Sequence, residues 1–216
     1  MILGRAYILN FDGKFLKVYV VTDNGQLRGR DFFEVVEESL KGGVTLIQLR
    51  EKNITSREYY EKALKLHELT KKYNVPLIIN DRVDIALVVG AEGVHVGQKD
   101  IPVSEVKRIS GGKLIVGATA NTVELALEAE RQGADYIGSG AVFTTPTKDD
   151  AKPMSLDTLK NITSSVNIPV CAIGGINIDN VEKLKGTGIK GVAVSSGIMG
   201  ADDVYGVSKR FFDLKF

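Results

Sequence analysis

Two short apolar runs in the stretch LIINDRVDIALVVGAEGVHVGQKD, residues 77–100, are each followed by an aspartate, Asp81 and Asp100. If these runs are neighbouring parallel strands, the two carboxylates meet at one edge, where they repel each other unless a cation sits between them. Oxygen ligands without a nearby His or Cys suit Mg²⁺. Taken singly, Asp81 is better explained as a helix cap and Asp100 as the start of a turn before Pro102. The pair on adjacent strands predicts a magnesium site.

A second segment, QLREK, carries cations. Gln48, Arg50 and Lys52 are spaced by two residues, so an extended chain turns all three side chains to one face. A guanidinium beside an ammonium needs an anionic partner and suits a phosphate or pyrophosphate. The alternative is a solvated charge run that leads into a helix, and spacing alone gives the two interpretations equal weight.

The long segment GAVFTTPTKDDAKP, residues 140–153, follows another apolar run. A connection of this length inside a compact domain is usually functional or mobile. Its polar side chains suited to a phosphorylated ligand are Thr144, Thr145, Thr147 and Lys148. The alternative is an ordinary surface loop, because these residue types are common there.

Two glycine-containing segments, IGGIN and SSGIM, follow the last two apolar runs and include Gly175, Ser195 and Ser196. Glycine leaves backbone N–H groups open to a ligand, and the loops after the seventh and eighth strands of an α/β barrel are a frequent phosphate site. Either segment alone is a weak signal, but together they predict such a site. A pyrophosphate site and a second phosphate site suggest a transferase with two substrates.

The elements that position these residues are eight apolar runs of strand length, separated mostly by segments with helical spacing. They are VYVVT from Val18, TLIQL from Thr45, LIIN from Leu77, GVHVG from Gly93, LIVGA from Leu114, YIGSG from Tyr136, PVCAIGG from Pro169 and GVAVSS from Gly191. Strands that are apolar on both faces and joined by helices run parallel. We predict one α/β domain over residues 1–216, a (β/α)8 TIM barrel, with residues 1–15 outside the pattern and suited to covering the barrel bottom. An open doubly wound sheet is the alternative, since periodicity does not show closure.

Predicted helices follow stripes such as Tyr59, Ala63, Leu66 and Tyr73, or Val123, Ala126 and Leu127.

Composition limits the partners. Lys plus Arg number 28 and Asp plus Glu 27 in 216 residues, so no strong field attracts nucleic acid or an anionic membrane, and small-molecule substrates are expected. Cys171 is the only cysteine, which excludes an intrachain disulfide and fits a reducing cytoplasm. No export signal or membrane span is evident. A homo-oligomer is compatible with the sequence, which does not decide it.

The motifs QLREK, IINDR, GVHVGQKD, VGATANT, TPTK, IGGIN and VAVSSGI, in this order and spacing, resemble the thiamine-phosphate synthase family from about Val18 to the C-terminus. The resemblance implies that Gln48, Arg50, Lys52 and Asn80 bind the pyrimidine diphosphate and that Asp81 and Asp100 hold its Mg²⁺. It implies that Thr145, Thr147 and Lys148 face the thiazole phosphate and the leaving pyrophosphate. It further implies that Gly175, Ser195 and Ser196 complete the phosphate site.

The resemblance also implies a mechanism. Mg²⁺, Arg50, Lys52 and Lys148 would stabilise the charge that grows on departing pyrophosphate, and the thiazole nitrogen would attack the pyrimidine-methyl cation left behind. A phosphosugar isomerase or aldolase on the same barrel would need a base or a lysine deep in a strand, and no strand offers that lysine. A relative that only binds thiazole phosphate is the other alternative.

One stretch departs from the family pattern, because many members carry Ser and His where this chain has Thr119 and Asn121. Thr119 keeps a hydroxyl that suits a hydrogen bond to pyrophosphate. The related thiazole tautomerases use a His near the second position as proton carrier, and Asn121 cannot titrate, which favours the synthase. His67 is expected on a helix surface or boundary, and His95 is expected to pack in or behind the barrel.

Overall fold

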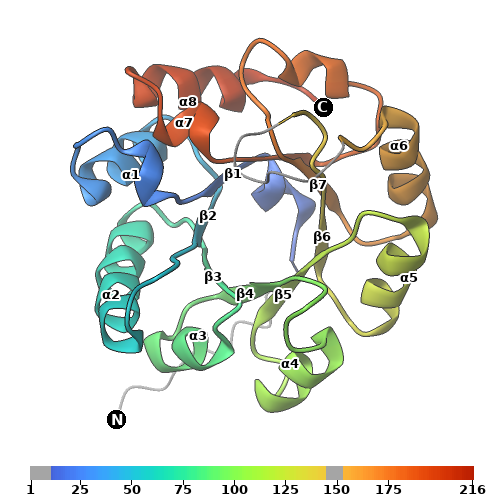
Figure 1. The fold of residues 1–216 in the computed structure, drawn as a ribbon, viewed down its shortest axis with the longest axis horizontal. Helices are drawn as coiled ribbons and strands as arrows, with labels where there is room; N and C mark the ends of the chain where they lie inside the picture. The colour runs from blue at the N-terminus through green and yellow to red at the C-terminus, as the bar shows by residue number, and fades with distance from the viewer. Residues whose placement is uncertain (1–10, 145–152) are drawn as a thin grey trace.

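The computed structural model describes residues 11–144 and 153–216, which form a closed barrel of parallel strands surrounded by helices (Figure 1). Within these residues each strand pairs with the next in chain order, and the last pairs with the first. The strands are β1 Val18–Val21, β2 Leu46–Leu49, β3 Leu77–Asn80, β4 Gly93–Val96, β5 Ile115–Thr119, β6 Tyr136–Ser139, β7 Val170–Ile173 and β8 Gly191–Val194. The (β/α)8 barrel is confirmed, and the open doubly wound sheet is excluded because β1 and β8 are hydrogen-bonded.

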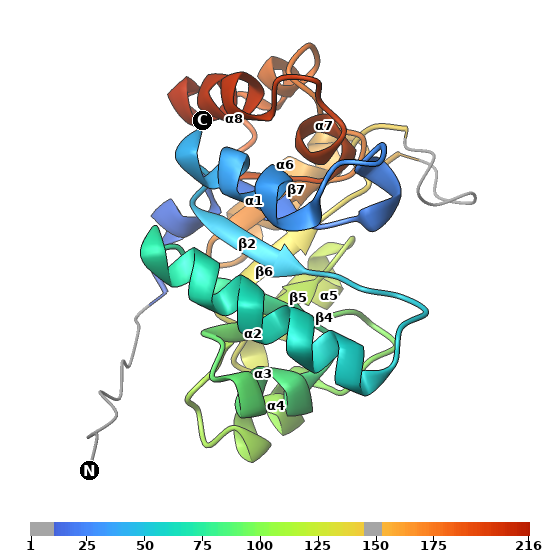
Figure 2. The same ribbon diagram turned by 90° about the vertical axis from the view of Figure 1, so that its left-hand side faces the viewer.

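Helices lie against the outer surface of the strands, as the side view in Figure 2 shows for the first half of the chain. The α-helices are α1 Phe32–Lys41, α2 Ser56–Lys72, α3 Val83–Val89, α4 Val103–Ile109, α5 Val123–Arg131, α6 Leu156–Ser165, α7 Ser196–Met199 and α8 Val204–Asp213. Three 3-10 helices are η1 Gly13–Leu16, η2 Asn24–Gln26 and η3 Val181–Leu184. Across the described part of the chain, no helix combines the length and apolar character needed to cross a membrane.

The strands are buried on both faces, as their uninterrupted apolar runs predict. In β1, Val18 and Val20 pack outward against helices, while Tyr19 and Val21 point into the barrel. Helix α2 buries Tyr59 together with Ala63 and Leu66, as predicted, whereas the fourth predicted residue, Tyr73, follows the helix end and is half-buried.

In α5 the prediction is partly wrong. Ala126 is buried but Leu127 is 45% exposed, and the second buried position is Ala129 instead. Ala126 and Ala129 are three residues apart and share one face of the helix, whereas Leu127 directly follows Ala126 and is turned away from that face.

Residues before β1 close the end of the barrel at which the strands begin. The ring of Phe11 stacks on Tyr136 with centroids 5.0 Å apart, and Leu16 is fully buried inside the barrel. The predicted covering role is therefore seen for residues 11–16, whereas residues 1–10 lie outside the described part.

Carboxylates at this end complete the strands. Glu92, just before β4, accepts a hydrogen bond from the backbone N–H of Leu77 at 2.8 Å and contacts Nε2 of His67 at 3.0 Å. Asp135, just before β6, accepts from the N–H of Val116 at 2.6 Å and pairs with Lys107 at 2.5 Å.

His67 is buried by its contact with Glu92, with 3% of the residue exposed, so the expected surface or boundary position is wrong. The helical pattern does not show that a carboxylate from a distant strand lies over this position and compensates for burial of the imidazole.

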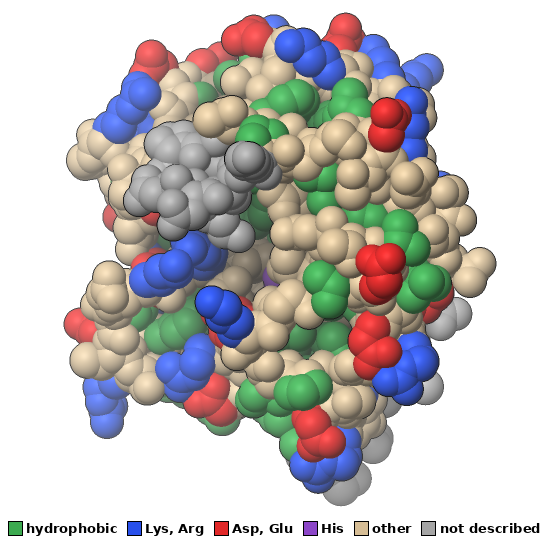
Figure 3. Space-filling view, turned by 45° about the vertical axis from the view of Figure 1, so that its right-hand side comes forward, with side chains coloured by type: hydrophobic (Ala, Val, Ile, Leu, Met, Phe, Trp, Pro, Cys, Tyr) green, Lys and Arg blue, Asp and Glu red, His purple; other side chains and the backbone are tan. Residues whose placement is uncertain are grey.

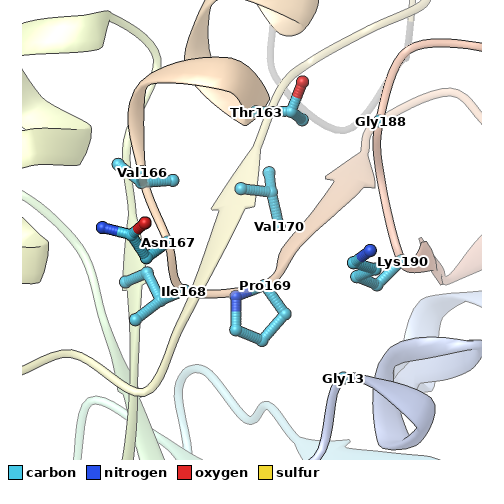
Figure 4. Close-up of a pocket in the computed structure, with 9 residues that line it drawn as sticks. All are labelled: Gly13, Thr163, Val166, Asn167, Ile168, Pro169, Val170, Gly188 and Lys190. Carbon is cyan, nitrogen blue, oxygen red and sulfur yellow. The ribbon is translucent and has the colours of Figure 1, made fainter.

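A cavity of about 290 Å³ lies at the same end, between the start of β7 and the loop before β8 (Figure 4). Its lining combines Pro169 and Val170 with the side chains of Thr163, Asn167 and Lys190. Both hydrogen bonds recorded for the Thr163 hydroxyl go to backbone carbonyls, at 2.9 and 2.6 Å. The cavity therefore has one cation and few unused polar groups.

Candidate active site

The opposite end of the barrel, at the carboxyl ends of the strands, holds a cavity of about 200 Å³ to which every strand or the loop after it contributes. Figure 3 shows a hollow with Lys and Arg side chains along one side. We call this space the mouth cavity. Its lining residues are Tyr19, Val21, Asp23, Gln48, Arg50, Asn80, His95, Thr119, Gly138, Gly140, Ala141, Cys171, Ile173, Gly174, Gly175, Ile176, Ala193, Ser195 and Ser196. Seven of the residues predicted from the sequence are among them, namely Gln48, Arg50, Asn80, Thr119, Gly175, Ser195 and Ser196.

The side chains of QLREK alternate between the inside and the outside of the barrel, as an extended strand requires, up to the point where β2 ends. Gln48 is buried inside the barrel and Arg50 lines the mouth cavity, with its backbone N–H donating to the Thr22 hydroxyl at 3.0 Å. Glu51 turns to the other side and pairs with Lys62. Lys52 is exposed and lies outside the residues that line the cavity. Because β2 stops at Leu49, the two-residue alternation holds for Arg50 and does not fix Lys52.

The two predicted aspartates face each other at the ends of β3 and β4. Partial burial, then the charge of Asp100 and a hydrogen bond to it, raises the pKa of Asp81 to about 6, while Asn80 and Arg50 act in the opposite direction. Asn80 Nδ2 donates to Asp81 at 2.6 Å. Asp81 also has a positive φ of 61°, a strained conformation for a residue with a Cβ. Strain and charge repulsion at one residue are typical of a functional position.

The structure separates the two alternative explanations for these aspartates. Helix α3 begins after Arg82 without a side-chain cap, so Asp81 is not the helix cap. Asp100 does complete a turn, because its Oδ2 accepts from the N–H of Gly97 at 2.7 Å. Turn formation therefore uses one carboxylate oxygen of Asp100 and leaves the other available.

The donor set fits a magnesium ion. No group of three or more His, Cys, Asp or Glu residues gathers among the described residues. Mg²⁺ does not require one, because it is commonly held by one or two carboxylates together with substrate phosphates and water. Two mutually repelling carboxylates beside a cavity that also contains Arg50 have this composition.

The loops after β7 and β8 pack closely across the mouth cavity from Arg50. Gly175 has a φ of 67°, and a Cβ at this position would lie 2.5 Å from the carbonyl oxygen of Thr144. Asn180 fixes the turn by donating to the Gly175 carbonyl at 2.8 Å. A side chain at Gly197 would meet the Ile176 carbonyl at 2.6 Å. Glycine is therefore required by close backbone approach, with Ser195 and Ser196 beside it at the cavity.

Three of the predicted residues, Thr145, Thr147 and Lys148, lie outside the described residues. Of the pair that departs from the family pattern, Thr119 lines the mouth cavity, whereas Asn121 accepts a hydrogen bond from the N–H of Gly140 at 3.3 Å. The structure thus places Thr119 at the mouth cavity and Asn121 in contact with the backbone.

Sequence reasoning missed two tyrosines and the connection they make. Tyr19 and Tyr136 belong to a hydrogen-bonded chain of five side chains, which we call the interior network. Its links join Gln48 Nε2 to Tyr19 Oη at 2.5 Å, Tyr19 Oη to Tyr136 Oη at 2.8 Å, Tyr136 Oη to His95 Nδ1 at 3.1 Å and His95 Nε2 to Thr119 Oγ1 at 3.0 Å. Tyr in place of Phe inside a barrel strand was the available signal, because a buried hydroxyl needs a partner.

His95 packs inside the barrel, which is one of the two positions expected from the sequence, in the barrel or behind it. Burial lowers its pKa to about 4, with the charge of Asp100 acting in the opposite direction. The imidazole is therefore neutral near pH 7.

Comparison with known proteins agrees with this geometry. The family described as thiamine monophosphate synthase matches residues 18–198. The thiamine-phosphate synthase of Clostridium tetani is 57% identical over 187 residues, 87% of this chain and 90% of the relative. That of Clostridium acetobutylicum is 50% identical over 198 residues, 92% of this chain and 94% of the relative.

Solved structures give the same picture. The thiamine phosphate pyrophosphorylase from Pyrococcus furiosus superposes with a TM-score of 0.85 at 45% identity, covering 92% of this chain and 95% of that one. A 3-hexulose-6-phosphate synthase superposes with a TM-score of 0.65 at 16% identity, which reflects the shared barrel alone.

Proposed function

Because the chain belongs to the thiamine monophosphate synthase family, and is thus an enzyme of the transferase class, we propose that it joins an aminopyrimidine-methyl diphosphate to a thiazole phosphate in a Mg²⁺-dependent reaction. The products are thiamine phosphate and pyrophosphate. The carbon–oxygen bond to the diphosphate breaks, pyrophosphate leaves with the electron pair, and the thiazole nitrogen supplies the pair for the new carbon–nitrogen bond.

The observation that carries the proposal is the composition of the mouth cavity. Arg50 and Asn80 lie on one side with the aspartate pair, and Gly175, Ser195 and Ser196 lie on the other. Two anionic groups on the two substrates would thus be held on opposite sides, with the reacting atoms between them. Holding two reactants in line supplies much of the rate enhancement of a two-substrate reaction.

Each group has a stated role in the proposal. Arg50 binds the diphosphate and stabilises the negative charge that develops as pyrophosphate leaves. Asp81 and Asp100 would hold Mg²⁺, which when bound supplies further positive charge at the diphosphate. Lys52 and Lys148 remain predicted contributors from the sequence. Gly175, Ser195 and Ser196 orient the thiazole phosphate through backbone N–H and hydroxyl groups.

The assay that tests the proposal mixes the protein with both substrates and Mg²⁺ and measures thiamine phosphate and pyrophosphate, with and without a chelator. We expect equal amounts of the two products and loss of both with the chelator. Asp81→Asn and Asp100→Asn should each reduce turnover about 100-fold or more, because each removes a carboxylate from the metal site.

Asp84→Asn is the matched control. Asp84 lies three residues from Asp81 but pairs with Arg82 at the surface, so this variant should stay within about twofold of the native rate. Binding of both substrates without product would contradict the proposal and leave a ligand-binding protein. Full activity of both metal-site variants would refute the metal assignment.

A cytoplasmic location and a homo-oligomer remain predictions. Burial raises the pKa of the Cys171 thiol to about 12 and leaves it unreactive, so this residue carries no information about the compartment.

A further inference from the structure

The interior network crosses the inside of the barrel beneath the mouth cavity. Its members come from β2, β1, β6, β4 and β5 in order, so the chain of contacts links strands that are not all neighbours. All members except Tyr136 also line the cavity. A network of this kind can transmit a direction of hydrogen-bond donation from one side of the cavity to the other. Each hydroxyl that accepts a hydrogen bond from one neighbour donates its own proton to the next.

With the Gln48 amide oriented so that Nε2 faces Tyr19, one direction of donation along the interior network satisfies every member. The amide nitrogen Nε2 of Gln48 is a hydrogen-bond donor and not an acceptor, so it donates to the Tyr19 oxygen. Each tyrosine has one proton, so Tyr19 donates to Tyr136 and Tyr136 donates to Nδ1 of His95. An imidazole that accepts at Nδ1 carries its proton on Nε2, and His95 therefore donates to Oγ1 of Thr119.

A charged imidazole does not satisfy the same contacts. Its Nδ1–H would donate to the Tyr136 oxygen, which already receives the Tyr19 proton. The proton of Tyr136 itself would then have no acceptor among the described residues, and a buried hydroxyl proton without a partner is unfavourable. The recorded contacts thus favour a neutral His95 with one specific tautomer.

Two glycines in the barrel strands leave room for the rings of Tyr136 and His95. A Cβ on Gly117 of β5 would lie 2.1 Å from Cζ of Tyr136 and 2.5 Å from Nδ1 of His95. A Cβ on Gly138 of β6 would lie 3.3 Å from Cε1 of the same imidazole. Glycines on the two strands that follow β4 therefore hold open the space that both rings occupy.

The last hydroxyl of the network, on Thr119, is at the mouth cavity. Within the described residues, the contact with His95 is the one hydrogen bond recorded for Thr119 Oγ1, while the Thr119 carbonyl accepts separately from Gln98. Once Oγ1 accepts from His95, its own proton is free to point into the mouth cavity.

We propose that the interior network is polarised from Gln48 toward Thr119, so that Thr119 presents a hydroxyl proton to an anionic oxygen in the mouth cavity. Tyr19, Tyr136 and His95 are then positioning residues that act through Thr119. In the opposite direction Thr119 would present a lone pair, which repels an anion. The inference rests on the proposed function in taking that oxygen to belong to the diphosphate or the leaving pyrophosphate.

The first test is independent of activity. The chain has two histidines, so a long-range ¹H–¹⁵N spectrum of protein labelled with ¹⁵N-histidine contains two imidazoles, and the His67→Gln variant identifies the signals of His95. At pH 7 without ligand, we expect His95 to carry its proton on Nε2 and to show the far downfield shift of a bare Nδ1. A proton on Nδ1, or on both nitrogens, overturns the proposal.

The second test is a double-mutant cycle on turnover. His95→Leu should lower kcat about 10-fold or more in a chain with Thr119, since hydrogen bonds to charged groups are worth that factor. In a Thr119→Val background the same change should alter kcat less than twofold, because the hydroxyl it orients is absent. His95→Gln, which keeps a donor near the Nε2 position, should recover part of the loss. Equal effects of His95→Leu in the two backgrounds overturn the proposal.

Tyr136→Phe in both backgrounds gives the same comparison if His95→Leu does not fold, because it removes one oxygen and keeps the ring. The two proposals fail separately. Product formation with a proton on Nδ1 refutes the polarised network alone. The expected tautomer without thiamine phosphate refutes the proposed function and leaves the direction of the network intact.

Discussion

The two ends of the barrel both carry carboxylates, half-buried where the strands begin and exposed at the mouth, but they use them differently. At the end where strands begin, Glu92 and Asp135 each bind a strand N–H and a cationic or imidazole partner. At the mouth, Asp81 and Asp100 face each other, and partial burial with this contact raises the pKa of Asp81. Acids that complete the backbone stabilise the fold, whereas acids left facing each other are available to a ligand.

The two cavities lead to the same conclusion. The cavity at the strand starts encloses about 290 Å³ and the mouth cavity about 200 Å³, so enclosed volume does not identify the site. The mouth cavity differs in that hydrogen-bonding side chains from several strands converge on it. The chemistry of the lining, rather than the space enclosed, distinguishes a site from a packing gap.

Among the changes that test the difference between the two ends, the largest loss of kcat is expected when the cation at the mouth is removed. Arg50→Ala should lower kcat by about 10²–10³-fold, because it removes a preformed positive charge aimed at the leaving group. Lys190→Ala, at the other cavity, is the matched control and should change kcat less than about twofold. Steady-state kinetics with both substrates measures both. Equal losses in the two variants would break the distinction between the ends.

A stability effect is expected at the end where strands begin. Glu92→Ala leaves the Leu77 N–H and the buried His67 without their acceptor and should lower the free energy of unfolding by about 3 kcal/mol. The kcat of the folded fraction should stay within twofold. Glu105→Ala, which removes an exposed pair with Arg108, should cost less than about 0.5 kcal/mol. Urea denaturation measures both, and a loss below 1 kcal/mol for Glu92→Ala would contradict the structural role.

The smallest effect is a stability gain at the mouth. Since the pKa of Asp81 is raised to about 6 in the folded protein, its ionised form disfavours folding above that pH. Asp81→Asn should therefore raise the free energy of unfolding at pH 7 without Mg²⁺ by about 1 kcal/mol, a value discounted for solvent screening of this exposed side chain. Asparagine also tolerates the positive φ at this position.

The gain from Asp81→Asn should disappear as the pH falls from about 6 toward 4, where the native carboxyl group becomes protonated in the folded protein. Denaturation curves at several pH values test this. A gain that does not depend on pH would assign it to backbone strain, and a loss at pH 7 would show that the two carboxylates do not repel each other.

Local pattern was sufficient for the strands and for most of the site. All eight predicted runs begin within one residue of the observed strand. Arg50, Asn80 and the aspartates meet at one end because parallel strands all finish at the same edge. Lys52 was not placed by the same reasoning, since it lies beyond the last residue of β2, where alternation no longer applies.

The sequence by itself determined the barrel, the end that carries the site and the residue types available there, because these follow from short-range periodicity and from the order of strands. Only the tertiary structure decided which polar groups are satisfied. It showed that Glu92 pairs with His67, that Asp81 and Asp100 remain opposed, and that Tyr19 connects through Tyr136 to His95. These contacts join residues that are far apart in the sequence and that the closed barrel and its helices bring together, and no local pattern records that proximity.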